Sequence, residues 1–169
     1  MVTHPLPFTL DPSPACAWTL LLSPLIAAIG ILLFGVGRRR LSAALAIGGL
    51  LVSFGCAGWL LLQALTGRLA LPSTVAISWV ALPDFSVSLN VLIDPLSLLM
   101  CLVVTGVGSG IFLYSTAYMA EDHAYSRYFG LLSLFTFSML TIVLAANFIQ
   151  LFLGWELVGF CSYMLIGHW

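Results

Sequence analysis

Long uncharged runs separated by short charged segments dominate the sequence. A membrane-spanning helix needs about 20 apolar residues, because it crosses about 30 Å of hydrocarbon at about 1.5 Å per residue. The last run, from Tyr128 to Trp169, contains one charge, Glu156, and would be about 63 Å long as a single helix, so it must fold back. Asn147 is the best break, because asparagine caps helices and tolerates turns. We therefore predict five membrane-spanning helices, at about residues 18–37, 41–65, 95–119, 128–146 and 148–168.

The segment between the second and third predicted spans, residues 66–94, has a different pattern. Residues 85–91 alternate strictly between apolar and polar side chains, and residues 74–80 do so loosely, which is the period of a β-strand. Residues 81–84 include Pro83 and Asp84 and are typical of a turn. This pattern predicts a β-hairpin outside the membrane that lies against the helix ends; an irregular loop is the alternative.

Composition supports a membrane protein. Hydrophobic residues make up 62% of the 169 residues and charged residues 7%, whereas soluble domains have roughly 45–50% and roughly 25%. A soluble enzyme and a disordered tail are disfavoured. A nucleic-acid-binding protein needs a basic patch, and the net charge here is −1. The fold class that remains is all-α: a multi-pass helical membrane protein with about five transmembrane helices and the hairpin between the second and third.

Charge placement predicts the orientation and the division of the chain. The segments 38–40 and 121–127 contain four of the five arginines, and the positive-inside rule puts both in the cytoplasm. Residues 1–17 lack the basic start of a cleavable signal peptide, so we expect an extended external N-terminus. The first two helices then occupy residues 18–65, the external loop occupies residues 66–94, and the last three helices occupy residues 95–169. The C-terminus is predicted to lie in the cytoplasm. Arg68 is the exception to the rule.

Glu156 is the candidate functional residue, with a predicted role in proton transfer. It is the ninth residue of the fifth predicted span and so lies near the middle of the membrane, about 12 Å along the helix. A charged side chain there costs about 2.5–3.5 kcal/mol, so the carboxyl either stays protonated or pairs with a cation. Gly159 on the same helical face would allow another helix to approach, and Tyr163 could donate a hydrogen bond to it; Phe152 shares this face. The structural alternative is a neutral glutamate satisfied by a neighbouring helix.

The chain contains no cation that could pair with Glu156 inside the membrane. It has no lysine, and all five arginines lie between the predicted spans. A cationic partner would therefore come from another chain or from further sequence, so we expect the polypeptide to need partners for function.

The other candidates have mainly structural explanations. Gly106 and Gly110 form a G-x-x-x-G pattern that favours helix packing, although a flexible point in a transport path is the alternative. Asp94 before Pro95 is typical of a helix start. His168, at the end of the last span, is an interface residue rather than a proton carrier. We expect a solvated cluster at Glu121, Asp122, His123 and Arg127, and buried packing thiols at Cys16, Cys56, Cys101 and Cys161.

Several motifs resemble the antiporter-like, proton-pumping subunit of respiratory NADH:quinone oxidoreductase, called chain 5 or subunit L of complex I. The most specific run is Phe-Leu-Gly-Trp-Glu-Leu-Val-Gly-Phe-Cys-Ser-Tyr-Met-Leu-Ile-Gly at residues 152–167. Residues 90–169 carry the resemblance, whereas residues 1–65 match in topology alone. The family commonly has Asp-Asn before the last span, and this chain has Ala146-Asn147. The remaining matching segments are residues 93–97, 103–108, 113–115, 118–119 and 126–129.

The resemblance implies a role for Glu156. In the family, the glutamate of this motif pairs with a lysine on a later helix and moves a proton when quinone is reduced elsewhere in the complex. Family chains are several times longer, so this chain would cover their opening part, and the lysine-bearing helix has no counterpart in it. The resemblance implies other membrane subunits as partners, a lipid bilayer around the chain and no nucleic acid. The localisation that fits is a bacterial inner membrane.

The sequence leaves three functions open. The first is proton translocation within complex I, as part of a translocase with no redox chemistry of its own. No cofactor motif is present, so NADH, FMN, iron–sulfur clusters and quinone would be held by the rest of the complex. The second is membership of a cation/proton antiporter or membrane-bound hydrogenase complex, and the third is a structural membrane subunit that moves no proton. A single carboxyl without other oxygen ligands favours H⁺ over Na⁺.

Overall fold

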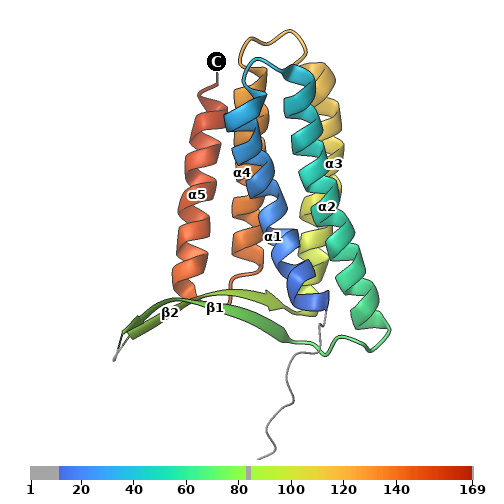
Figure 1. Cartoon of the computed structure of the whole chain (residues 1–169), viewed down its shortest axis with the longest axis vertical. Helices are drawn as coiled ribbons and strands as arrows, with labels where there is room; N and C mark the ends of the chain where they lie inside the picture. Colours follow the sequence, from blue (N-terminus) through green and yellow to red (C-terminus); the bar gives the residue numbers. More distant parts are fainter. Residues whose placement is uncertain (1–11, 83–84, 169) are drawn as a thin grey trace, which may run out of the picture.

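The computed structural model describes residues 12–82 and 85–168 of the chain. Five long helices stand side by side, and a two-stranded hairpin lies across one end of the bundle (Figure 1). All five helices are long and apolar enough to cross a membrane, which confirms the predicted fold class. The elements are α1 (Pro12–Gly30), the π-helical turn η1 (Ile31–Gly35), α2 (Arg39–Leu65), β1 (Ser73–Leu82), β2 (Phe85–Ile93), α3 (Pro95–Tyr118), α4 (Tyr125–Val143) and α5 (Phe148–Ile166).

Helix boundaries differ from the predicted ones by a few residues. The first helix begins at Pro12 rather than residue 18, so the predicted extended lead-in of residues 1–17 is wrong for residues 12–17; residues 1–11 lie outside the described part. The fourth helix begins at Tyr125 and ends at Val143, three residues earlier at each end than predicted. Both helices begin early because a helix continues past the edge of the hydrocarbon wherever its backbone can still form hydrogen bonds.

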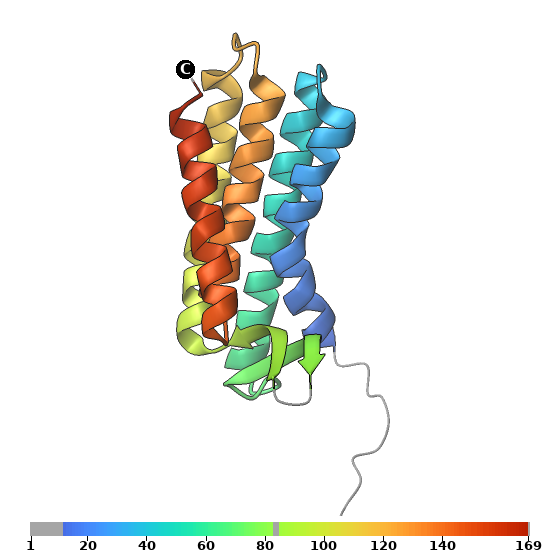
Figure 2. The same ribbon diagram turned by 90° about the vertical axis from the view of Figure 1, so that its left-hand side faces the viewer.

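The predicted hairpin is confirmed. Strands β1 and β2 pair antiparallel, with Val75 opposite Val91 and Ile77 opposite Leu89. The predicted turn at residues 83–84 lies outside the described residues. The hairpin runs beneath the ends of the helices in both views (Figures 1 and 2). Val91 and Ile93 are buried, so β2 forms part of the core at this end of the bundle, which we call the hairpin end.

Polar side chains fasten the hairpin to the start of α5. Gln150 is buried, and its amide bonds both backbone groups of Asn90: the Asn90 N–H donates to Oε1 at 2.9 Å, and Nε2 donates to the Asn90 carbonyl at 2.8 Å. The Leu92 N–H donates to the Leu144 carbonyl at 2.9 Å, and Asn147 Nδ2 donates to the Ser88 carbonyl at 2.6 Å. The turn between α4 and α5 therefore completes hydrogen bonds along the edge of β2.

Both predicted helix caps are present. The Asp94 side chain accepts from the Ser97 N–H at 2.6 Å, and the Ser97 hydroxyl accepts from the Asp94 N–H at 2.8 Å, which is a reciprocal capping box. Asn147 Oδ1 accepts from the Gln150 N–H at 2.8 Å. The break predicted at Asn147 is therefore confirmed, because the uncharged run is divided into two helices and Asn147 caps the start of the second one, α5.

Serines and glycines hold α1 against α2. The Ser23 hydroxyl donates to the Gly49 carbonyl and the Ser53 hydroxyl donates to the Leu20 carbonyl, so that the two hydroxyl oxygens lie 2.7 Å apart between the helices. A Cβ on Gly49 would lie 2.8 Å from Ala27 Cβ, so only glycine allows this approach. Small residues and hydroxyls are what helix pairs use in a membrane, where apolar burial between helices gains little over contact with lipid.

Replacement of Gln150 by alanine tests the attachment of the hairpin. The change removes two hydrogen bonds worth about 1 kcal/mol each, so we expect exchange of the Asn90 amide hydrogen to accelerate roughly 30-fold. Hydrogen exchange followed by mass spectrometry measures this. Gln63→Ala is the matched control, because the Gln63 side chain makes no hydrogen bond within the described residues. Equal exchange in the two variants would contradict the proposed attachment.

Candidate functional site

Glu156 lies at mid-depth in α5, as the sequence predicted. It is the ninth of the 19 residues of α5, about 12 Å from one end and about 15 Å from the other. Helix α5 runs along the bundle from the hairpin end to the end with the helix-connecting loops (Figure 1). The carboxyl is therefore far from either end of the helix bundle.

A cavity of about 560 Å³ opens beside Glu156 between α4 and α5. Glu156, Gly159 and Ser162 form the α5 stripe along it, with spacing i, i+3 and i+6. Met139 and Ile142 of α4 form the opposite wall. The Ser162 hydroxyl is the polar side chain that shares this cavity with the carboxyl, and the remaining lining is apolar.

The carboxyl has no partner in the described part of the chain. Within residues 12–82 and 85–168, Glu156 makes no hydrogen bond or ion pair, and its side chain is exposed. Trp155 beside it is 67% exposed, and much of α5 is apolar and uncovered. An unpaired carboxyl at this depth is costly, so the exposed side of α5 is suited to contact with a further protein surface.

The supporting residues predicted around Glu156 are only partly brought to it. Gly159 lines the cavity and meets nothing within 4 Å in the described residues, so the space for an approaching helix is open. Tyr163 is 74% exposed and makes no hydrogen bond to Glu156. Phe152 is half exposed and does not line the cavity. The hydrogen bond predicted from Tyr163 is therefore absent within this chain.

Sequence reasoning missed Gly154, which fixes how α5 meets α4. A Cβ on Gly154 would lie 2.9 Å from Ile142 Cγ1 and 3.3 Å from the Ile142 backbone nitrogen. The two helices therefore contact each other closely at Gly154, about half a turn around α5 from Glu156, and this contact helps to position the carboxyl beside the cavity. A glycine in a membrane helix is a signal for close helix packing, and Gly154 carries that signal. Its position in the sequence does not reveal whether it faces a neighbouring helix.

The two glycines singled out in α3 behave differently. Gly106 packs on Phe54 of α2, where an added Cβ would lie 3.1 Å from the ring. Gly110 meets nothing within 4 Å in the described chain, and Gly108 instead approaches Leu50 at 3.3 Å. The packing role is thus supported for Gly106 but not for Gly110. The glycines of α3 that contact α2 are Gly106 and Gly108.

Asp122 and His168 form a contact that the sequence did not predict. Asp122 Oδ2 and His168 Nε2 are 3.2 Å apart, with the side chains only 9% and 3% exposed, so Asp122 is not part of a solvated cluster. The backbone N–H of Ala124 donates to Asp122 and, with the weaker influence of His168, lowers the pKa of this carboxyl against the opposing effect of burial. The pair joins the α3–α4 loop to the end of α5.

The cysteines fit packing roles to different extents. Cys101 and Cys161 are buried, as predicted. Cys16 and Cys56 are only partly buried, and the Cys16 thiol donates to the Cys56 carbonyl at 3.6 Å, which adds a contact between α1 and α2. All four are free thiols.

The five long apolar helices define a multi-pass helical membrane protein. A family model described as NADH-Ubiquinone oxidoreductase (complex I), chain 5 N-terminus, matches residues 79–129, from the hairpin to the first turns of α4. The resemblance found in the sequence is thereby confirmed.

Individual relatives agree with this assignment. The chain is 49% identical over 92 residues to NAD(P)H-quinone oxidoreductase subunit 5, chloroplastic, of Carpenteria californica, and 48% identical to the proteins of that name from Guizotia abyssinica and Helianthus annuus. Each match covers 54% of this chain and 12% of the relative. A chain in the solved Mrp complex from Dietzia sp. DQ12-45-1b has 29% identity and a TM-score of 0.61, covering 94% of this chain and 16% of that one.

The matched part of the chain is therefore similar to the N-terminal part of complex I subunit 5, and the fold of the chain resembles that of the chain in the Mrp complex. The chain spans only a small part of the length of these relatives, about an eighth of the curated ones.

A pair of glycine variants tests the contact between α4 and α5. Gly154→Ala places a methyl group against the Ile142 side chain and backbone, so we expect destabilisation by about 1–3 kcal/mol. Gly55→Ala in α2 is the control, because an added methyl group there meets nothing within 4 Å in the described chain, and it should change stability by less than about 0.5 kcal/mol. Thermal unfolding of the two variants in the same detergent measures the difference. Equal losses would show that Gly154 does not set this contact.

Proposed function

We propose that this chain takes part in proton translocation through Glu156, as a membrane subunit of an NADH:quinone oxidoreductase of the complex I type. The observation that carries the proposal is the unpaired Glu156 carboxyl at mid-depth in α5, beside a cavity and an uncovered helix face. A carboxyl in that setting binds or releases a proton according to its neighbours, which is the property that a proton relay needs.

The cation that pairs with Glu156 would be a lysine on a helix that this sequence does not contain. The chain has no lysine, and its arginines lie at the helix ends and in the loops. A helix seated on the exposed face of α5 could approach closely at Gly159, where nothing in the described chain lies within 4 Å. When that lysine moves or changes charge, the proton affinity of Glu156 changes with it.

The transported ion is H⁺ in this proposal. Sodium sites in proteins use several oxygen ligands, whereas the cavity beside Glu156 offers one hydroxyl, that of Ser162, among its described lining residues. Energy would come from quinone reduction in other subunits, which hold NADH, FMN and iron–sulfur clusters in complex I. In this chain, helix packing and proton transfer would be the whole contribution.

A cation/proton antiporter complex is the second candidate. It is favoured by the Mrp complex structure, whose likeness covers 94% of this chain, including α1 and α2. The two candidates share the proton step at Glu156 and differ in what drives it. Turnover that depends on NADH and quinone supports the first candidate, whereas cation-driven proton exchange without quinone supports the second.

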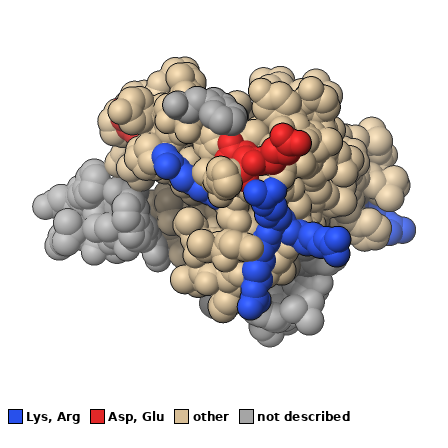
Figure 3. Space-filling view, turned by 90° about the horizontal axis from the view of Figure 1, so that it is seen from above, with Lys and Arg blue, Asp and Glu red and all other residues tan. Residues whose placement is uncertain are grey.

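Charge at the other end of the bundle supports an orientation. Arg38, Arg39, Arg40 and Arg127 lie with the loops opposite the hairpin, which we call the arginine end, and Figure 3 shows basic and acidic side chains gathered there. The positive-inside rule puts the arginine end in the cytoplasm of a bacterial cell and the hairpin outside.

Reporter fusions check this topology. Fusions after Arg40 and after His123 should report the cytoplasm, and a fusion near residue 80 should report the outside, because arginine-rich short loops are retained on the cytoplasmic side. A cytoplasmic signal near residue 80 would contradict the five-span arrangement in the membrane.

Glu156→Gln tests the proton-transfer role. The amide has nearly the same shape but binds no proton in this range, so we expect proton pumping by the assembled complex to fall at least about tenfold. Proton uptake into membrane vesicles, measured alongside NADH-driven quinone reduction, separates pumping from assembly. Glu121→Gln is the control, because Glu121 is an exposed loop carboxylate. Unchanged pumping in Glu156→Gln would leave only a structural role.

A further inference from the structure

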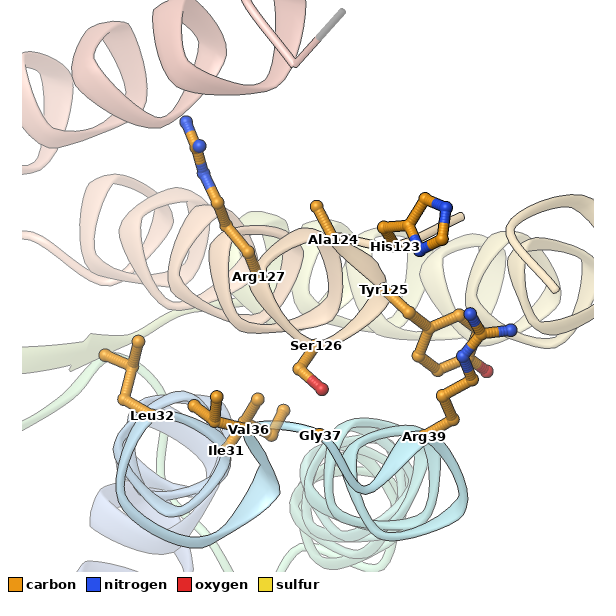
Figure 4. Close-up of a pocket in the computed structure, with 10 residues that line it drawn as sticks. All are labelled: Ile31, Leu32, Val36, Gly37, Arg39, His123, Ala124, Tyr125, Ser126 and Arg127. Atoms are coloured by element: carbon orange, nitrogen blue, oxygen red, sulfur yellow. The ribbon is translucent and has the colours of Figure 1, made fainter. Parts of the chain in front are cut away.

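The arginine end contains a second cavity that Glu156 does not use. It has a volume of about 380 Å³ and lies where η1 and the starts of α2 and α4 meet. Figure 4 shows Arg39 from α2 and Arg127 from α4 at its two sides, with Ser126 between them and His123 above. Leu32 of η1 and Val36, which follows η1, contribute apolar surface.

Two arginines give the described lining of this cavity a positive charge. None of its described lining residues is acidic. The only ion pair within residues 12–82 and 85–168 joins His168 to Asp122, so Arg39 and Arg127 are not paired with carboxylates there. Arg39 does donate a hydrogen bond to the Ala120 carbonyl, which holds its guanidinium at the edge of the cavity.

A hydrogen-bonded cluster gives this cavity a fixed wall. The Gly35 carbonyl, at the end of η1, accepts from the Ser42 hydroxyl at 2.9 Å and from the Ser126 hydroxyl at 2.8 Å. The two hydroxyls are themselves 2.9 Å apart. The π-helical turn exposes this carbonyl to the side chains of α2 and α4, and it thereby ties together the three elements that carry the cavity.

An apolar groove of about 320 Å³ continues from the cavity toward the membrane centre. It shares Leu32 and Arg127 with the cavity and extends along α4 to Leu134, about 10 Å further along the helix. Its walls are α1 and Met164 of α5, and α4 lies between these helices in Figure 2. The groove offers no acidic residue.

We propose that this cavity and groove bind an anionic phospholipid, with the headgroup at the mouth that Arg39 and Arg127 line from its two sides and an acyl chain along α4 to Leu134. The cavity and groove together suit an amphipathic ligand, because the cationic cavity at the end of the bundle joins the apolar groove, which extends toward the membrane centre. Basic pockets between helices at the cytoplasmic side of a membrane are suited to anionic headgroups. A free phosphate would fill the mouth but would leave the apolar groove without a ligand.

Titration of phosphatidylglycerol onto the purified, detergent-solubilised complex, read by native mass spectrometry, tests the proposal. Phosphatidylglycerol should bind more tightly than phosphatidylcholine. Removal of each cation should weaken phosphatidylglycerol binding by about fivefold, and Arg39→Gln with Arg127→Gln by roughly 30-fold. Arg40→Gln removes the same charge at the same end but does not line the cavity, so it should have little effect.

Two further arms separate the lipid from other occupants. Leu134→Trp fills the groove and should weaken phosphatidylglycerol binding, while millimolar inorganic phosphate should not displace the lipid. In the unmodified complex, phosphatidylglycerol with a photoreactive acyl chain should label the peptides that contain Leu134 or Met164. This labelling requires no variant, so it stands even where a substitution prevents assembly.

The proposal fails if phosphatidylglycerol and phosphatidylcholine bind equally, or if Arg40→Gln has the same effect as the arginine pair. It also fails if inorganic phosphate displaces the lipid, or if the Leu134→Cys variant crosslinks to a protein helix that fills the groove. None of these outcomes depends on proton transfer at Glu156, so the lipid site and the proposed function are tested separately.

Discussion

Hydrocarbon satisfies neither backbone groups nor charges, and most of this structure follows from that constraint. Hydroxyls within the helices bond carbonyls of their own helix or of a neighbour, as Ser23 and Ser53 do between α1 and α2. Asp94 and Asn147 satisfy exposed amides at the starts of α3 and α5. Glu156 departs from this rule at mid-depth, since within the described residues no group bonds its carboxyl. A departure that costs stability points to function, and in this molecule it lies on the helix face that the chain leaves uncovered.

The two ends of the bundle are held in different ways. At the hairpin end, the amide of Gln150 pairs with the backbone of β2, so the start of the helix that carries Glu156 is fixed to the hairpin. At the arginine end, the Asp122–His168 contact fixes the last turn of the same helix to the α3–α4 loop. Between these attachments, Gly154 allows α5 to pack closely against α4. The carboxyl is thus positioned by contacts at both ends and in the middle of α5, although it makes none of its own in the described chain.

Sequence patterns of short range predicted much of this molecule. Five spans, the hairpin, the cap at Asp94 and the break at Asn147 all follow from periodicity, charge spacing and local hydrogen bonding. Predictions that required knowledge of a neighbour were less successful. Tyr163 does not reach Glu156. Asp122, predicted to be solvated, is nearly buried, because its partner His168 lies 46 residues further along the chain.

The sequence alone determined that this protein spans a membrane and that one acidic residue lies deep within it, because hydropathy and helix rise depend only on residue order. The tertiary structure decided which glycine meets a helix, which side chains hold the hairpin, and that Arg39 and Arg127 flank one cavity. These features arise where segments distant in sequence pack together. Helix rotation and crossing set those contacts, and a hydrophobic run that is apolar on every side does not encode them.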